Sequence, residues 1–203
     1  MVQRIFKASV AVSLLVLLSS CATMSPEECK VADWRDVGQR DGLAGQTMSH
    51  FQSRVEDCAK AGVAINTQAY RTGREVGLRS YCRLENAVPL GLNGGYYAGV
   101  CPPAIDVLFQ QRFQVARSVH DLRNDVRSLD DRSESLERRL RETSHEEDRR
   151  LKEAKSDDER KKIRKSLDDE RRDIRKDLSE ADHQLRRKRD ELRSAEYALG
   201  NLR

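Results

Sequence analysis

Residues 115–140 of this 203-residue chain read VARSVHDLRNDVRSLDDRSESLERRL, and this stretch decides the fold. Its hydrophobic residues alternate three and four apart, which is the heptad pattern of a helix that packs one face against another helix. The positions on this seam are Val115, Val119, Leu122, Val126, Leu129, Ser133, Leu136 and Leu140. Because only Ser133 among them is polar, the pattern predicts a coiled coil.

A second heptad seam lies nearer the C-terminus. Its positions are Leu167, Arg171, Ile174, Leu178, Ala181, Leu185, Lys188, Leu192, Ala195, Leu199 and Leu202. Residues 141–166, between the two seams, are almost entirely polar, and opposite charges four apart there support a solvated helix. Two arrangements follow: an antiparallel hairpin that turns near Ser144 or Ser156, or one long helix that needs a partner chain. The polar stretch between the seams favours the hairpin.

Charge separates this half of the chain from the other half. Charged residues make up 35% of the sequence, whereas about a quarter is usual in soluble domains. Residues 104–203 hold 27 Lys or Arg and 25 Asp or Glu, and residues 1–103 hold 11 and 9. We therefore expect an all-α chain: a small helical domain over 25–103, then a charged coiled coil over 104–203.

The charge balance excludes a general attraction to nucleic acid. The net charge is only +4, and basic clusters such as Arg160–Lys162 lie beside carboxylates. We interpret these clusters as solvated helix faces, with a lipid-headgroup site as the alternative.

The N-terminus has the pattern of an export signal. Arg4 and Lys7 precede an apolar stretch, residues 8–18, which is too short to span a bilayer. The next residues, Leu18-Ser19-Ser20-Cys21, resemble the lipobox of bacterial lipoproteins. That resemblance implies a signal peptide over 1–20, and a lipidated N-terminus and short linker over 21–24.

In such lipoproteins the cysteine carries a diacylglycerol and a further acyl chain such as palmitate, so Cys21 would anchor the chain in membrane lipid. Ala22 and Thr23 follow the cysteine where inner-membrane lipoproteins commonly have Asp. The resemblance therefore implies the periplasmic face of the outer membrane.

The other four cysteines fit an exported protein. Cys29, Cys58, Cys82 and Cys101 form an even set without C-x-x-C spacing, so we expect disulfide bonds in an oxidising compartment and no metal. Three pairings are open to four cysteines. We favour Cys29 with Cys58 and Cys82 with Cys101, because the second bond would close a glycine-rich stretch.

Helix signals recur through residues 25–81. Ser25 and Pro26 predict the start of a first helix that runs to about Gly42, with Asp33 as a candidate second cap. Ser49 predicts the start of a second helix that ends at Gly62. A third begins at Asn66 or Thr67 and continues to Tyr81, and a loop with Gly91, Gly94, Gly95 and Gly99 follows.

A glycine pair occurs twice in these helices, as Gly38-x-x-x-Gly42 and Gly73-x-x-x-Gly77. Glycine inside a helix costs about 1 kcal/mol relative to alanine, so we expect the pairs to permit a close helix crossing. A ligand lying across the glycine face is the alternative. The candidate partner-binding surface comprises Trp34, Gly38, Gly42, Tyr70, Gly73, Gly77, Tyr96 and Tyr97, and Asp41 and Glu75 are expected as surface charges.

The order of these motifs resembles a known family. The run comprises Asp33-Trp34, Gly38, Asp41-Gly42, Gly45, Cys58, Tyr70, Gly73, Gly77-Leu78, Tyr81-Cys82 and Tyr97-x-Gly99-Val100-Cys101-Pro102. It is similar to proteobacterial lipoproteins grouped as domain of unknown function 2799, over about residues 25–103. The resemblance implies an envelope location and these domain limits, and it carries no reaction.

No catalytic constellation is visible in the sequence. His50, His120, His145 and His183 are scattered, and neither H-E-x-x-H nor G-x-S-x-G occurs. We therefore expect no enzyme and no cofactor.

Two functions remain open. The first is a structural spacer or assembly arm built by the coiled coil, with self-association through residues 104–203 or an envelope protein as partner. The second is a binding module in which residues 25–103 recognise an envelope protein or peptidoglycan. We expect any contact with peptidoglycan to be non-covalent, because the chain ends Gly200-Asn201-Leu202-Arg203 without a terminal lysine.

Overall fold

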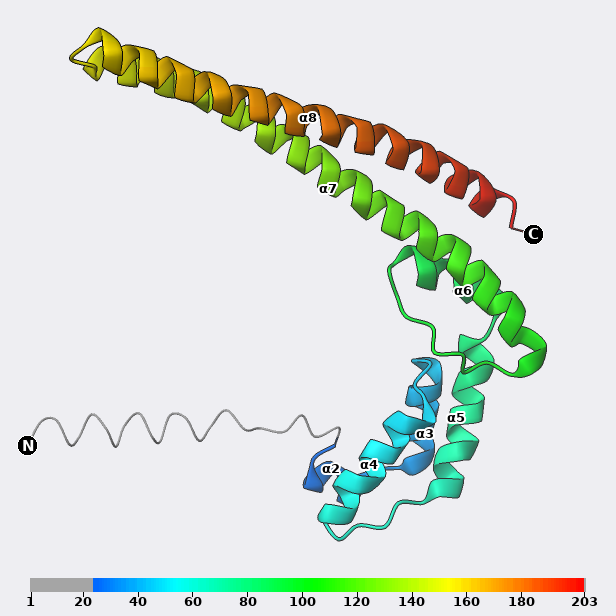
Figure 1. Ribbon diagram of the computed structural model, residues 1–203. Helices are drawn as coiled ribbons and strands as arrows, with labels where there is room; N and C mark the ends of the chain where they lie inside the picture. Colours follow the sequence, from blue (N-terminus) through cyan, green and yellow to red (C-terminus); the bar gives the residue numbers. More distant parts are fainter. Residues whose placement is uncertain (1–23, 203) are drawn as a thin grey trace, which may run out of the picture. The chain divides into compact units, whose positions relative to one another are not determined.

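The computed structural model describes residues 24–202, which form seven helices and no strand. The helices are α2 (Pro26–Val31), α3 (Trp34–Leu43), α4 (Met48–Lys60), α5 (Thr67–Tyr81), α6 (Leu84–Leu92), α7 (Pro103–Glu153) and α8 (Asp157–Gly200) (Figure 1). Among the described residues, no helix is both long enough and apolar enough to cross a membrane. The all-α prediction is confirmed. The predicted signal peptide and Cys21 lie outside the described residues.

The described chain divides into two compact units. The first, which we call the stapled unit, holds the residues up to Arg83 together with Tyr97–Asp106. The second, the hairpin unit, holds Leu84–Tyr96 and the chain from Val107 onward. Residues 84–96, expected within the domain 25–103, are grouped in this division with the chain from Val107 onward.

Side-chain caps set the helix ends in the stapled unit. Ser25 and Glu28 form a capping box at the start of α2, where Ser25 and Pro26 predict a helix start. One continuous helix to Gly42 does not form, because Ala32 is extended. The candidate second cap, Asp33, begins a separate helix, α3, by accepting from two backbone amides. Thr47 rather than Ser49 caps α4, and Asn66 caps α5.

Two disulfide bonds hold the stapled unit together. Cys29 is bonded to Cys58 and Cys82 to Cys101, with Cα atoms 5.5 Å apart in each pair, so the favoured pairing is confirmed. The core around the first bond includes Trp34, Val37, Phe51 and Tyr70. The Phe51 and Tyr70 rings stack with centroids 3.9 Å apart, so α4 and α5 share one small core.

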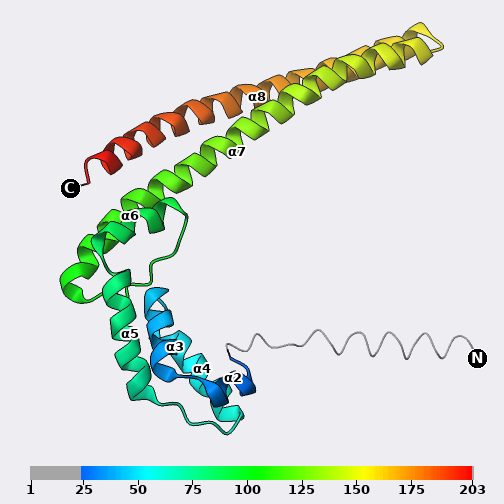
Figure 2. The ribbon, with the colours of Figure 1, turned by 180° about the vertical axis from the view of Figure 1, so that it is seen from behind.

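The hairpin unit is an antiparallel pair of long helices, which run side by side in both ribbon views (Figures 1 and 2). Ser156 caps α8 by accepting from the Glu159 amide, which makes it the turn residue that the sequence offered beside Ser144. Hydrophobic seam residues of the two helices meet in clusters, one built by Leu136, Ile174 and Ala181. The hairpin arrangement is therefore the one that this chain adopts, and both seams are used within it.

Helix α6 was missed in the sequence, where Gly91 is assigned to a loop. Pro89 lies inside this helix and masked the helical pattern. A Cβ atom on Gly91 would lie 2.5 Å from the carbonyl oxygen of Phe113 and 2.7 Å from the Cβ of Ala116. The glycine therefore permits α6 to approach the first turns of α7.

Candidate functional site

The paired glycines form a close crossing between α3 and α5. A Cβ atom on Gly38 would lie 2.0 Å from the Tyr70 carbonyl oxygen, and one on Gly73 would lie 1.9 Å from the Arg35 carbonyl oxygen. These neighbours are backbone atoms, which cannot move aside without displacing a helix. The glycine face is thus filled by the opposite helix, which leaves no room for a ligand across it.

This crossing changes the candidate partner-binding surface. Six of its expected members are buried: Trp34, Gly38, Gly42, Tyr70, Gly73 and Gly77. They pack the interior of the stapled unit, so they do not form a surface. The sequence pattern located the crossing but could not show that the crossing leaves no open face.

The two adjacent tyrosines of the expected surface lie in different environments. Tyr97 is buried, and its hydroxyl donates to the Asp106 carboxylate and accepts from the Cys101 amide at 3.3 Å. Burial, together with the Asp106 hydrogen bond, raises the pKa of Tyr97. Tyr96 belongs to the hairpin unit and is 81% exposed. Tyr97 therefore supports the Cys82–Cys101 region, and only Tyr96 is available to a partner.

A buried carboxylate lies beside the crossing. Asp41, expected as a surface charge, is only 5% exposed, which corrects that expectation. Its carboxylate accepts from the Tyr70 hydroxyl at 2.9 Å and from Arg54 Nη2 at 3.0 Å. Burial and the Asp41 hydrogen bond raise the pKa of Tyr70. Asp41 therefore joins α3, α4 and α5 and is already engaged by two donors.

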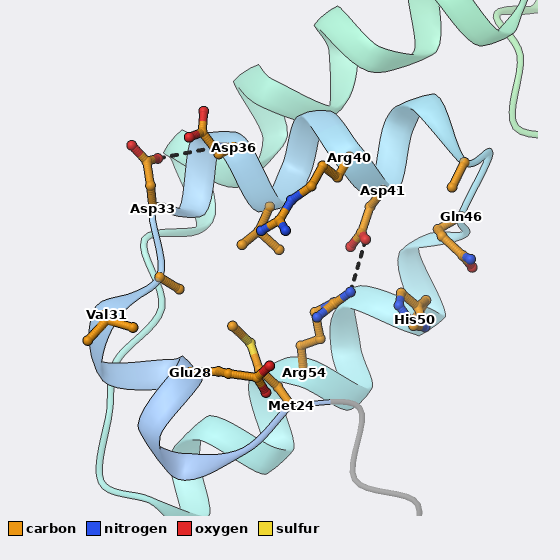
Figure 3. A pocket seen from close by; sticks show the side chains of 13 residues that line it. Met24, Glu28, Val31, Asp33, Asp36, Arg40, Asp41, Gln46, His50 and Arg54 are labelled. Carbon is orange, nitrogen blue, oxygen red and sulfur yellow. Dashed lines mark hydrogen bonds and ion pairs between the residues drawn. The ribbon is translucent and has the colours of Figure 1, made fainter.

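A hollow of about 590 Å³ opens in front of this carboxylate (Figure 3). Arg40 of α3 and His50 of α4 line it, and Met24 lies on its opposite side, where the described chain begins. Two of its acidic groups serve the backbone: Glu28 accepts from the Ser25 amide at 2.8 Å, and Asp33 caps α3. The hollow is polar, and its charged groups are typical of a binding surface. In the part of the chain that the structure describes, they do not form the pair of a nucleophile and a hydrogen-bonded base that a catalytic site needs.

Ion pairs cross between α7 and α8 along the hairpin. They join Arg123 with Glu196 (2.7 Å), Asp125 with Lys188 (3.2 Å), Asp130 with Arg189 (2.8 Å), Arg139 with Glu170 (3.5 Å) and Glu147 with Arg171. Each pair is partly or fully exposed, so each contributes little stability alone. Together they restrict how the two helices align, because sliding one helix would separate oppositely charged partners.

Two of these ion pairs involve the polar residues of the second seam. Hydrogen bonds to Asp168 and Glu147 raise the pKa of Arg171, and those to Glu191 and Asp125 raise the pKa of Lys188. Thr143, on α7, is buried although polar and donates to the Arg139 carbonyl. The polar seam positions in the sequence signalled these interactions, but the partners became apparent only in the folded hairpin.

Comparison with known proteins gives one match. Residues 33–118 match a family model described as Protein of unknown function (DUF2799). The matched segment begins at the cap of α3 and ends within α7, so it includes the glycine crossing, three of the four disulfide cysteines and α6. No curated protein and no solved structure matches the chain.

Proposed function

Since residues 33–118 belong to the DUF2799 family, whose description assigns no function, we propose one from the residues themselves. The protein is a non-enzymatic lipoprotein of the bacterial envelope, anchored by Cys21 at the periplasmic face of the outer membrane. It acts as a structural spacer or assembly scaffold through the α7–α8 hairpin.

The self-contained hairpin is the observation that carries this proposal. Seam residues of α7 and α8 pack against each other within one chain, as Leu136 and Ile174 do, so the chain itself supplies hydrophobic contacts that hold the arm. The 44 residues of α8 correspond to about 66 Å at the usual helical rise. An arm of that length suits a protein that holds two envelope components a fixed distance apart.

The start of the stapled unit supports an anchor close to the membrane. Met24 is only 8% exposed, and the Cys58 sulfur lies 3.9 Å from its sulfur. Cys21 precedes Met24 by three residues, which span at most about 11 Å when fully extended. Lipid on Cys21 would therefore keep the stapled unit next to the bilayer.

Matched deletions in the two helices test the spacer function. Removal of residues 123–136 and 178–191 takes two heptads from each helix, keeps the turn and shortens the arm by about 21 Å. We expect the lipidated variant to lose its cross-linked assembly in intact envelopes. A control keeps the full length and the seam residues but replaces the exposed residues of both segments, and it should still assemble. Assembly by the shortened chain would contradict the spacer function.

A second candidate function, the binding module, is supported by the polar hollow in the stapled unit and by exposed Tyr96. A partner of residues 25–103, either an envelope protein or non-covalently bound peptidoglycan, would contact Arg40 and His50. Substitution of both by alanine should then abolish partner capture, whereas the shortened hairpin should retain it. The opposite pattern would favour the spacer.

A further inference from the structure

Positive charge is concentrated at the turn of the hairpin. Residues 149–165, which we call the basic tip, hold nine Lys or Arg and four Asp or Glu. The paired helices behind them, residues 115–148 and 166–199, hold 16 Lys or Arg and 20 Asp or Glu. The shaft is therefore net negative while its end is strongly positive.

The cations of the tip also differ from those of the shaft in their contacts. Several shaft cations reach a carboxylate on the opposite helix, as Arg123 and Arg189 do. In the described structure, most tip cations are exposed and form no ion pair within 4.0 Å; they are Lys152, Lys155, Arg160, Lys161, Lys162, Arg164 and Lys165. Their charge is therefore available to an outside partner.

Three of the four carboxylates of the tip lie at the start of α8. Asp157, Asp158 and Glu159 form the first turn of α8, where negative charge stabilises the helix N-terminus. The Glu159 carboxylate accepts from the Lys155 amide at 2.9 Å. Sequence adjacency suggested that these acids neutralise the basic cluster, whereas the fold uses them to begin α8.

A small hydrophobic cluster keeps the tip folded. Ala154, Ile163 and Leu167 are buried together, with Leu151 packed against them. This cluster extends the seam into the last turn before the loop, so exposed cations of both helices surround a folded end. An end that carries exposed cations on both helices suits a flat, negatively charged surface.

We propose that the basic tip binds an anionic phospholipid surface. Each Lys or Arg near such a surface strengthens binding roughly five-fold, and clusters on helices are a usual source of this attraction. The segment 149–165 contains no aromatic residue, which disfavours single-stranded nucleic acid, because bases stack on aromatic side chains. The inference rests on the proposed spacer function and deepens it, because it assigns a partner to the turn end of the hairpin.

Vesicle binding tests the tip directly. The chain from Ala22 to Arg203 keeps every described residue and lacks Cys21, so lipid on that residue cannot contribute. We expect it to sediment with phosphatidylcholine vesicles that contain about one third phosphatidylglycerol, and not with pure phosphatidylcholine vesicles. Binding should weaken steeply as salt is added, because salt screens exposed charges.

A matched pair of variants separates the tip from general charge. Arg160→Gln, Lys161→Gln and Arg164→Gln remove three tip cations, and Arg175→Gln, Lys176→Gln and Arg187→Gln remove three exposed shaft cations of the same types. The tip variant should lose on the order of 100-fold in vesicle affinity, and the shaft variant less than about three-fold. Circular dichroism of both variants checks that the hairpin remains folded.

Three outcomes would overturn the proposal: no preference for phosphatidylglycerol, equal losses in the two variants, or binding to isolated peptidoglycan that exceeds binding to vesicles. The spacer function is judged separately by the shortened hairpin, which keeps the tip. If shortening abolishes assembly while vesicle binding is absent, only the tip inference fails. If vesicle binding is present while the shortened chain still assembles, the spacer function fails.

Discussion

The stapled unit and the hairpin unit pack helices by opposite means. In the stapled unit, α3 and α5 meet backbone to backbone, and a single added methyl group would lie about 2 Å from a carbonyl oxygen. In the hairpin unit, α7 and α8 meet through side chains that repeat each heptad, with ion pairs beside them. The stability of the first unit therefore depends on a few glycine positions that tolerate no larger residue. The stability of the second unit is distributed over many similar side-chain contacts.

Reduction of the disulfide bonds should give the largest difference in stability between the two units. The bonds close loops of 29 and 19 residues, each worth about 3 kcal/mol, and a domain is typically stable by only 5–15 kcal/mol. We expect a reductant to unfold the stapled unit and leave the hairpin helical. The single tryptophan, Trp34, reports the stapled unit by fluorescence, and far-ultraviolet circular dichroism reports mainly the long helices.

Simultaneous loss of both signals on reduction would show that the units are not independent. A Cys29→Ser, Cys58→Ser variant without reductant provides the control, because it removes one bond and leaves the other in place.

Gly73→Ala should have the next largest effect. The new Cβ atom would meet the Arg35 carbonyl at 1.9 Å, so α3 and α5 must separate, at a cost above about 3 kcal/mol in unfolding free energy. Gly200→Ala, at a helix end with open space around it, should be nearly neutral. Denaturant titrations of both variants measure the difference, and a mild effect of Gly73→Ala would refute the close crossing.

Ile174→Ala should weaken the hairpin by about 3 kcal/mol, because the buried side chain loses its contacts with Leu136 and leaves a cavity. The loss should appear in circular dichroism and not in Trp34 fluorescence. Val107→Ala, in the same unit but 72% exposed, should cost less than about 0.5 kcal/mol. Equal effects of the two substitutions would mean that Ile174 does not lie in a seam.

Ser133→Ala should have the smallest effect on the free energy of unfolding, and it should stabilise the protein rather than destabilise it. Within the described chain, the Ser133 hydroxyl oxygen is buried without a hydrogen-bond partner. Its removal should stabilise the hairpin by about 1 kcal/mol, because an unsatisfied buried group is lost and alanine is the better helix former. A rise in the hairpin's melting temperature checks this, and a fall would indicate a partner for the hydroxyl.

The sequence predicted features that local chemistry determines. Heptad spacing located both seams, and Ser156 was one of two candidate turn residues. The glycine-rich stretch between Cys82 and Cys101 favoured the observed pairing. Gly38 and Gly73 indicated a close crossing before the helices were placed.

Features that depend on tertiary contacts were missed. Asp41 is a polar residue on a polar helix, and only the approach of Tyr70 and Arg54 makes it a buried acceptor. Pro89 obscured α6, whose burial requires α7. The unpaired charge of the basic tip was hidden because Asp157–Glu159 adjoin Arg160 in sequence but act at the helix start.

The distance between two spin labels, one on each long helix, tests the central claim that the arm is an intramolecular hairpin. Ser135 and Ser179 are exposed, and a label at each should give a separation below about 30 Å, since paired helix axes lie 8–10 Å apart. That distance should persist when labelled chain is diluted with unlabelled chain. A separation near 66 Å, which one continuous helix would give, or loss of the short distance on dilution, would contradict the account.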